Sequence, residues 1–174
     1  MTILRIEQLT YGVEKLAECI EFLEHWGLEK LNSGASGAEF RTLENQIITL
    51  RLIQDPDLPP TYEDGATLRE VIWGVDSQTT LDEIEVELSK DRKVSKDANG
   101  ALHSYDDRNN YLGFKIAEII EVNLTKESLN FVDDIERVNE RGWPEDRISP
   151  IRIGHLVYSI EAKDNWAAAE FYID

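Results

Sequence analysis

Two stretches of the sequence decide the fold: GAEFRTLENQIITLRLI, residues 37–53, and GALHSYDDRNNYLGFKI, residues 100–116. They follow one pattern and align without a gap. In each, a run rich in β-forming residues is followed by a turn and a second such run, which predicts a two-stranded hairpin. The turns are Glu44-Asn45 in the first copy and DDRNN in the second. A pattern that occurs twice indicates an internal repeat, so the flanking sequence should hold the rest of the unit twice.

The residues before the first hairpin predict a strand, a helix and a short strand. Ile3–Val13 alternates between apolar and polar residues, as a half-buried strand does. Apolar residues then recur at helical spacing from Leu16 to Trp26, and Gly27 ends the predicted helix. Leu28–Leu31 is predicted to be a short strand. Together with the hairpin, these elements give the order βαβββ.

The same order precedes the second hairpin. Thr67–Val75 predicts a strand, and WGVD at its end matches YGVE at the end of the first strand. Thr79 or Thr80 can cap a helix that carries its apolar residues on one face as far as Leu88. Arg92–Ser95 predicts a short strand. The chain therefore contains two βαβββ units.

We predict an α+β fold in which the paired βαβββ units form one cupped mixed-sheet domain. Pairing is expected because one small open sheet with a single helix cannot bury both of its faces. The predicted divisions are a first unit at 1–57, a linker at 58–66, a second unit at 67–120, an interdomain linker at 121–150, and the first strand and helix of a truncated second domain at 151–174. Within the interdomain linker, Leu129–Val138 can form a short helix.

The last segment begins the unit a third time, because IRIGHLVYSIE at 151–161 repeats LRIEQLTYGVE at 4–14. A predicted helix with Trp166, Ala169 and Phe171 follows. We expect this fragment to expose a strand edge and an apolar helix face. A fragment with such surfaces should either dock on another copy or be disordered, and of these we predict the homodimer.

Composition narrows the partners and the compartment. The chain has 35 acidic and 18 basic residues and a net charge of −17, which argues against nucleic acid as a partner. Solubility is the main interpretation of this acidity, and a basic partner or a saline habitat is the alternative. No apolar run approaches the roughly 20 residues that a membrane span needs. The single cysteine, Cys19, fits a reducing compartment, so we expect a cytoplasmic protein.

Paired βαβββ units, with GHLVY at 154–158 ahead of AAAEFYID at 167–174, resemble the vicinal oxygen chelate superfamily. That superfamily includes glyoxalases, bleomycin-resistance proteins and two-domain extradiol ring-cleavage dioxygenases. The resemblance is most specific at 151–174, where Gly-His lies on the opening strand ahead of an Ala-rich helix. In the dioxygenase branch the amino-terminal domain has lost its metal site and the carboxy-terminal domain carries it. The resemblance therefore implies an amino-terminal domain plus the start of the next.

By the same resemblance, His155 is the first ligand of Fe(II), or of Mn(II) in some relatives. The other family ligands, a second His and a Glu, belong to a fourth unit that this sequence does not contain. Two imidazoles and a carboxylate leave adjacent metal positions open for a catecholic substrate and dioxygen. His155 alone cannot hold iron in that way. We therefore expect this chain to be inactive alone and to bind no metal, and whether the full-length protein is an enzyme stays open.

The positions equivalent to His155 in the first two units are Gln8 and Glu70. Glutamine is a poor metal ligand, whereas Glu70 could ligate. The closing strands carry Arg51 and Lys115, which would repel a metal ion. We therefore predict that Glu70 pairs with Arg51 or Lys115 inside the sheet and that residues 1–117 hold no metal site.

The remaining candidate residues have structural interpretations. His25 lies near the end of the first predicted helix, where a surface position suits it. His103 lies on a predicted strand, and a sheet-packed or exposed side chain is favoured over one that lines a cleft. Cys19 lies on the apolar helical stripe and is interpreted as a core residue rather than a nucleophile.

These observations support a main hypothesis and two alternatives. The main one is the amino-terminal, non-catalytic part of a metal-dependent extradiol ring-cleavage dioxygenase-like protein that acts on a small catecholic aromatic. The first alternative is a metal-free module of the glyoxalase/bleomycin-resistance type that binds a small hydrophobic or aromatic molecule in the cup. The second is a structural or dimerisation domain.

Overall fold

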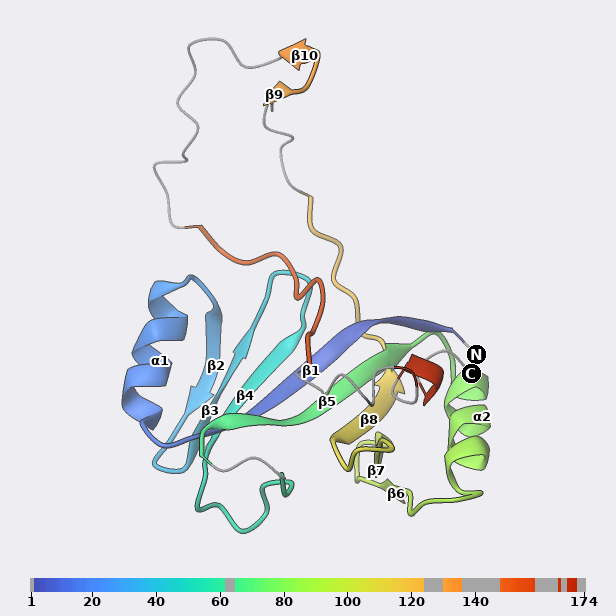
Figure 1. Cartoon of the computed structure of the whole chain (residues 1–174). Helices are drawn as coiled ribbons and strands as arrows, with labels where there is room; N and C mark the ends of the chain where they lie inside the picture. The colour runs from blue at the N-terminus through green and yellow to red at the C-terminus, as the bar shows by residue number, and fades with distance from the viewer. Residues whose placement is uncertain are drawn as a thin grey trace.

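The computed structural model describes residues 2–61, 65–123, 130–135, 148–158, 166 and 169–171. One open, mixed eight-stranded sheet runs in the order β2-β3-β4-β1-β5-β8-β7-β6, with α1 and α2 at opposite ends of it (Figure 1). The first unit consists of β1 (Ile3–Val13), α1 (Leu16–His25), β2 (Glu29–Ser33), β3 (Gly37–Arg41) and β4 (Ile47–Leu52). The second consists of β5 (Thr67–Val75), α2 (Gln78–Leu88), β6 (Ser95–Lys96), β7 (Leu102–Tyr105) and β8 (Tyr111–Ile116). The predicted α+β fold of two βαβββ units is confirmed.

The two units meet along the antiparallel pair of β1 and β5 at the centre of the sheet. Each of these strands has a parallel neighbour on its other side, which is the closing strand of its own unit. Gln8 pairs with Ile47 across β1 and β4, and Glu70 pairs with Tyr111 across β5 and β8. The opening strands thus place Gln8 and Glu70 at equivalent positions, as the sequence predicts.

The same pairing corrects the alignment of the two hairpins. Because Gln8 and Glu70 are equivalent, Ile47 is the counterpart of Tyr111, whereas the gap-free alignment matches Tyr111 with Ile48. The alignment is therefore wrong by one residue in the closing strands. A one-residue shift moves every side chain to the other face of a sheet, so strand pairing detects it although a run of β-forming residues does not.

Two groups of buried apolar side chains form the core. The first core cluster comprises Val13, Leu16, Leu23, Leu28, Ala38, Phe40, Ile48 and Leu50. The second core cluster comprises Ile6, Leu9, Val71, Val75, Leu81, Ile84, Leu102, Leu112 and Phe114. Each helix contributes its apolar stripe to the cluster of its own unit, which explains why each unit needs its helix.

The cap of α2 differs from the prediction. The N-cap residue is Ser77, whose side-chain oxygen accepts from the backbone N–H of Thr80 at 3.3 Å. Thr80 is buried inside the helix, and its hydroxyl donates to Asp76 at 2.6 Å. Serine is as good an N-cap as threonine, so the choice depends on where the preceding strand ends.

The described part of the last segment does not form the expected strand. Residues 151–158 have no strand pairing. Their side chains Ile153, Leu156 and Tyr158 pack against the core clusters instead. In Figure 1 the backbone of this segment runs between the ends of the sheet that carry α1 and α2. A strand needs a neighbouring strand for its backbone hydrogen bonds, and among the described residues this segment pairs with none. It packs on the apolar core clusters instead. The assignment of residues 151–174 to a second domain stays a prediction.

The predicted helix at Leu129–Val138 is wrong in the part that the structure describes. β9 (Asn130–Phe131) and β10 (Asp134–Ile135) pair as an antiparallel hairpin. Asp133 between them has a φ of 66°, a left-handed conformation that a right-handed helix cannot include.

In the described residues, neither α1 nor α2 is long and apolar enough to cross a bilayer.

Candidate functional site

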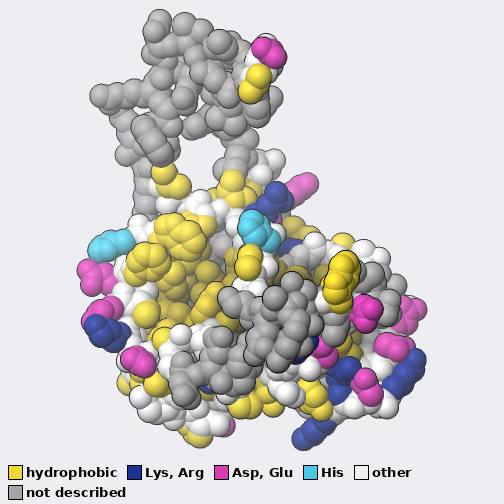
Figure 2. Space-filling model, in the orientation of Figure 1, with side chains coloured by type: hydrophobic (Ala, Val, Ile, Leu, Met, Phe, Trp, Pro, Cys, Tyr) yellow, Lys and Arg dark blue, Asp and Glu magenta, His cyan; other side chains and the backbone are white. Residues whose placement is uncertain are grey.

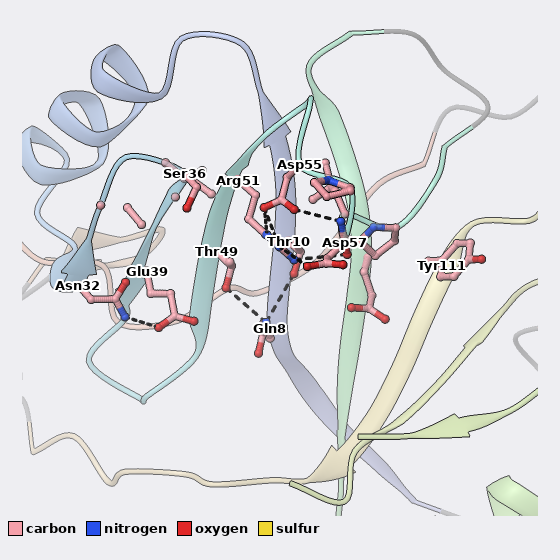
Figure 3. Close-up of a pocket in the computed structure, with 18 of the residues that line it drawn as sticks. Gln8, Thr10, Asn32, Ser36, Glu39, Thr49, Arg51, Asp55, Asp57 and Tyr111 are labelled. Atoms are coloured by element: carbon pink, nitrogen blue, oxygen red, sulfur yellow. Dashed lines mark hydrogen bonds and ion pairs between the residues drawn. The ribbon is translucent and has the colours of Figure 1, made fainter. Parts of the chain in front are cut away.

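A cavity of about 930 Å³ opens over the sheet and receives side chains from both units (Figure 3). Its position follows from the alternation of the strands: Ile48 points into the first core cluster, whereas Thr49 lines the cavity. The strands contribute Gln8, Thr10, Glu39, Thr49, Arg51, Glu70, His103 and Tyr111, and the segments 32–38 and 55–60 supply most of the remaining lining residues. The cavity is therefore lined mainly by hydrogen-bonding side chains.

The first unit contributes a neutral group and an ion pair to this cavity. The amide nitrogen of Gln8 donates to the hydroxyls of Thr49 at 3.3 Å and Thr10 at 3.5 Å (Figure 3). Arg51 lies 2.6 Å from Asp55 and 4.0 Å from Asp57. The backbone N–H of Asp57, together with Arg51, holds the pKa of Asp55 below its ordinary value. Arg51 thus turns to the loop beyond its own strand.

The second unit contributes a histidine–glutamate pair. His103 Nδ1 lies 2.7 Å from Glu70 Oε1, and His103 Nε2 lies 3.7 Å from Asp97 Oδ2. Glu70 is 7% exposed, whereas the His103 side chain is 26% exposed and reaches the cavity. The hydrogen bond to Glu70 raises the pKa of His103 above its ordinary value, and burial opposes the shift only in part. The imidazole therefore lies between two carboxylates.

This pair corrects two predictions. The partner of Glu70 is His103, because Arg51 pairs with Asp55 and Lys115 pairs with Glu118 at 3.2 Å. His103 lines the cavity, although a sheet-packed or exposed position was favoured. Both errors have one cause, since His103 and Glu70 lie on strands that are not neighbours and meet only when the sheet is assembled.

Gly113 explains how these side chains meet. It lies on β8, between β5 and β7, and pairs with Ile72 on one side and with His103 on the other. A Cβ at this position would lie 3.5 Å from His103 Nδ1 and 2.6 Å from the carbonyl oxygen of Leu102. The missing side chain lets His103 reach across β8 to Glu70. A glycine inside the strand YLGFKI was the sequence signal for this close approach.

The residues present in the cavity do not fit the metal that the resemblance implies. Gln8 and Glu70 occupy the opening-strand positions, and Glu70 is already bonded to His103. The equivalent closing-strand positions hold Thr49 and Gly113, which offer neither a carboxylate nor an imidazole. Across the part of the chain that the structure describes, no group of three or more His, Cys, Asp or Glu side chains could hold a metal ion.

The remaining candidates lie outside the cavity. His155 is exposed in the segment that crosses the core clusters, and its role as a metal ligand stays a prediction. His25 is exposed at the last residue of α1, and Cys19 packs half-buried against the first core cluster, both as the sequence predicts.

Searches by sequence give no family: no protein-family profile matches, and no curated protein matches. Solved structures do match. A Mn(II)-bound glyoxalase from Novosphingobium aromaticivorans aligns with a TM-score of 0.55 at 16% identity, over 71% of this chain and 43% of that one. Homoprotocatechuate 2,3-dioxygenase from Brevibacterium fuscum aligns with a TM-score of 0.55 at 17% identity, over 68% of this chain and 34% of that one.

The homoprotocatechuate 2,3-dioxygenase from Arthrobacter globiformis gives the same TM-score and identity and is covered over 38% of its length. One structure of the Brevibacterium fuscum enzyme holds 3,4-dihydroxyphenylacetate. This chain therefore has the fold of this glyoxalase and these dioxygenases, and it spans less than half the length of these neighbours. At these identities the likeness concerns the fold alone.

Proposed function

We propose that this chain is the amino-terminal, non-catalytic part of a metal-dependent extradiol ring-cleavage dioxygenase-like protein that acts on a small catecholic aromatic. Three observations support the proposal: the chain folds as one paired-unit domain, it covers less than half of each neighbour, and among the described residues its cavity offers no metal-binding donor set. Fe(II) or Mn(II) would be bound by a domain that opens at residue 151. His155 would supply its first ligand, and the ion would bind the vicinal oxygens of the substrate.

The test compares this chain with the longer native gene product that the proposal implies. Intact mass spectrometry of the protein from its source cells should give a mass above that of the 174 residues. After anaerobic loading with Fe(II) or Mn(II), the longer protein should retain the ion and this chain should not. His155→Ala should abolish retention in the longer protein, whereas His25→Ala, at another exposed histidine, should leave it unchanged. A native mass equal to that of 174 residues, or a tightly held ion in this chain, would overturn the proposal.

A second candidate function is metal-free binding of a small molecule in the cavity. The volume of about 930 Å³ falls in the range of small-molecule sites. Because the lining is rich in hydroxyl, amide and carboxylate groups, a hydroxyl-bearing ligand suits it better than a purely hydrophobic one. Catechol, added without metal, should shift the imidazole resonances of His103 saturably and leave those of His25 unchanged. Absence of any shift at His103 would contradict this candidate.

A dimerising role has support on the surface of the first unit. Phe22 and Trp26 are 64% and 57% exposed and stack with their rings 6.2 Å apart. Hydrophobic side chains also gather over the face beside α1 (Figure 2). A homodimer would bury this surface, and light scattering of the purified chain would detect it.

The cytoplasm is the proposed compartment, since Cys19 is a free thiol.

A further inference from the structure

We propose that Gln46 is a positioning residue whose side-chain amide fixes the backbone at Ile153 and so sets the place of Gly154-His155 relative to the first domain. The inference rests on the proposed function, in which His155 is a metal ligand. It concerns a residue of the first unit that lies far from His155 in sequence and that the resemblance does not assign.

The contacts of Gln46 use its whole amide group. Its Oε1 accepts from the backbone N–H of Ile153 at 2.5 Å, and its Nε2 donates to the carbonyl of Ile153 at 3.2 Å and to the carbonyl of Ile6 at 2.5 Å. Gln46 is 1% exposed. A buried amide is costly unless it is hydrogen-bonded, so this side chain is satisfied only while residue 153 lies where it does.

The geometry imitates a strand pair. In a sheet, a residue exchanges its N–H and C=O with one residue of the neighbouring strand. Here the side-chain amide of Gln46 takes the place of that neighbour, although residues 151–158 belong to no strand. The first domain therefore recognises the backbone of Ile153 without requiring it to join the sheet, and the same two bonds remain possible if this segment pairs elsewhere in a longer protein.

The turn between β3 and β4 extends this contact along the segment. The backbone N–H of Leu43 donates to the carbonyl of Pro150 at 3.1 Å, and that of Glu44 donates to the carbonyl of Ile151 at 3.0 Å. Hydrogen bonds from one turn thus reach residues 150, 151 and 153. Contacts at residues 150–151 and at residue 153 fix the direction of this segment as well as its position. His155 follows two residues after Ile153.

The same turn also contacts the end of the second unit, just before the interdomain linker begins. Arg5 and Asn45 both donate to the carbonyl of Glu118, at 3.2 and 3.0 Å, and the backbone N–H of Glu118 donates to Glu7 Oε1 at 3.0 Å. Arg5 also donates to the carbonyl of Glu44 at 2.9 Å. A linker alone would leave the next segment a wide range of positions. Contacts at both of its ends remove that freedom.

The chemistry requires glutamine rather than an isosteric acid. Glutamate at this position could accept from the Ile153 N–H, but it could not donate to the carbonyls of Ile6 and Ile153 when ionised. Its charge would then face two carbonyl oxygens in a buried place. Gln46→Glu keeps the shape and removes the donors, which separates the hydrogen bonds from packing. Gln54→Glu makes the same chemical change at an exposed position and is the matched control.

The first arm of the test uses this chain and hydrogen exchange followed by NMR. In the unmodified chain, the Ile153 amide should exchange about tenfold or more slowly than the amide of the exposed Val157. Gln46→Glu should remove most of that protection and Gln54→Glu should not. Equal exchange at Ile153 and Val157 in the unmodified chain overturns the inference, even if the Gln46 variant fails to fold.

The second arm uses the longer gene product loaded with Mn(II), with the EPR spectrum of the ion as the readout. Gln46→Glu should weaken Mn(II) retention about tenfold and alter the spectrum, and lowering the pH should restore part of the affinity relative to Gln54→Glu, because a protonated glutamate can donate again. If His155→Ala leaves Mn(II) retention intact, the proposed function fails. If His155→Ala abolishes retention but Gln46→Glu changes neither affinity nor spectrum, the positioning role fails and the proposed function stands.

Discussion

The β3–β4 turn and the β7–β8 turn occupy equivalent places in the two units and use their polar groups in opposite ways. Arg41 pairs with Ile47 before the first turn, as Tyr105 pairs with Tyr111 before the second. Each turn is closed by a backbone hydrogen bond, from Thr42 to Gln46 at 3.0 Å and from Asp106 to Asn110 at 2.9 Å. Each also contains a left-handed asparagine, with φ of 72° at Asn45 and 61° at Asn109.

In the second turn, donors of the turn itself surround Asp106. Asp106 is 3% exposed, and its carboxylate accepts from the backbone N–H groups of Arg108 and Asn110, both at 2.8 Å, and from the Asn110 side chain at 2.9 Å. The first turn directs the backbone donors of Leu43 and Glu44 and the Gln46 amide to a segment much later in the chain. Two turns with the same backbone conformation can thus make different contacts. A turn that pairs more of its polar groups internally has fewer donors and acceptors left for another segment.

The largest effect should follow from Asp106→Ala in the second turn. The change leaves the part-buried backbone donors of Arg108 and Asn110 without their acceptor, so the free energy of unfolding should fall by about 3 kcal/mol. Urea denaturation measures this, and Asp82→Ala on the exposed side of α2 is the control. Protection of the Ile153 amide should not change. Loss of that protection would mean that the two turns are coupled.

Gly113→Ala should rank second. The added Cβ would lie 2.6 Å from the carbonyl of Leu102, and strain of this kind costs about 2 kcal/mol. Thr49 lies at the equivalent position of the first unit, and Thr49→Ala there should cost less than about 1 kcal/mol, because it removes only the Gln8 hydrogen bond. Thermal unfolding of both variants decides the matter. Equal losses would show that the units are closer to symmetric than their contacts indicate.

Gln46→Leu should have a smaller effect on global stability, about 1 kcal/mol, because the released backbone of Ile153 can turn to water. The loss should be concentrated at residues 150–153, where amide exchange should quicken while the centre of the sheet keeps its protection. Denaturant titration measures the global stability, and hydrogen exchange measures the local loss at residues 150–153. A loss of stability as large as that of Asp106→Ala would place Gln46 in the folding core instead.

The smallest effect should be a shift in titration at the His103–Glu70 pair. The pKa of His103 is raised in the folded chain, so its contribution to stability is fully present below the ordinary histidine pKa of about 6.5 and is lost as the pH rises through the raised value. Glu70→Gln should lower the pKa of His103 and flatten this part of the stability–pH curve. NMR titration of the imidazole measures the first effect. An unchanged pKa would assign the shift to Asp97.

The sequence predicted the parts of the fold that depend on local pattern. Strands, helices and their order follow from apolar spacing, and pairing of the units follows from the repeat. The equivalence of Gln8 and Glu70 could be predicted because YGVE and WGVD mark the same strand end. Cys19 and His25 were placed correctly, since a position on a helix face is decided within a few residues.

Features that depend on pairing at a distance were missed. The one-residue shift in the hairpins and the contact of His103 with Glu70 both require the strand register, which the sequence pattern leaves open. The expected strand at 151–158 depended on partners that the described residues do not provide. The role of Gln46 was invisible because a glutamine after a turn is ordinarily exposed, and only the assembled chain buries it.

The contacts on both sides of the predicted linker make its length nearly free to vary. Glu118 on one side and Pro150 on the other are bonded to the same small part of the first unit. Any segment between them closes a loop whose ends are already together, and doubling such a loop costs only about 0.6 kcal/mol. Insertions or deletions between these residues should therefore leave residues 150–153 in place. The linker is where related chains can differ most at the least cost, and where a fused reporter would disturb the molecule least.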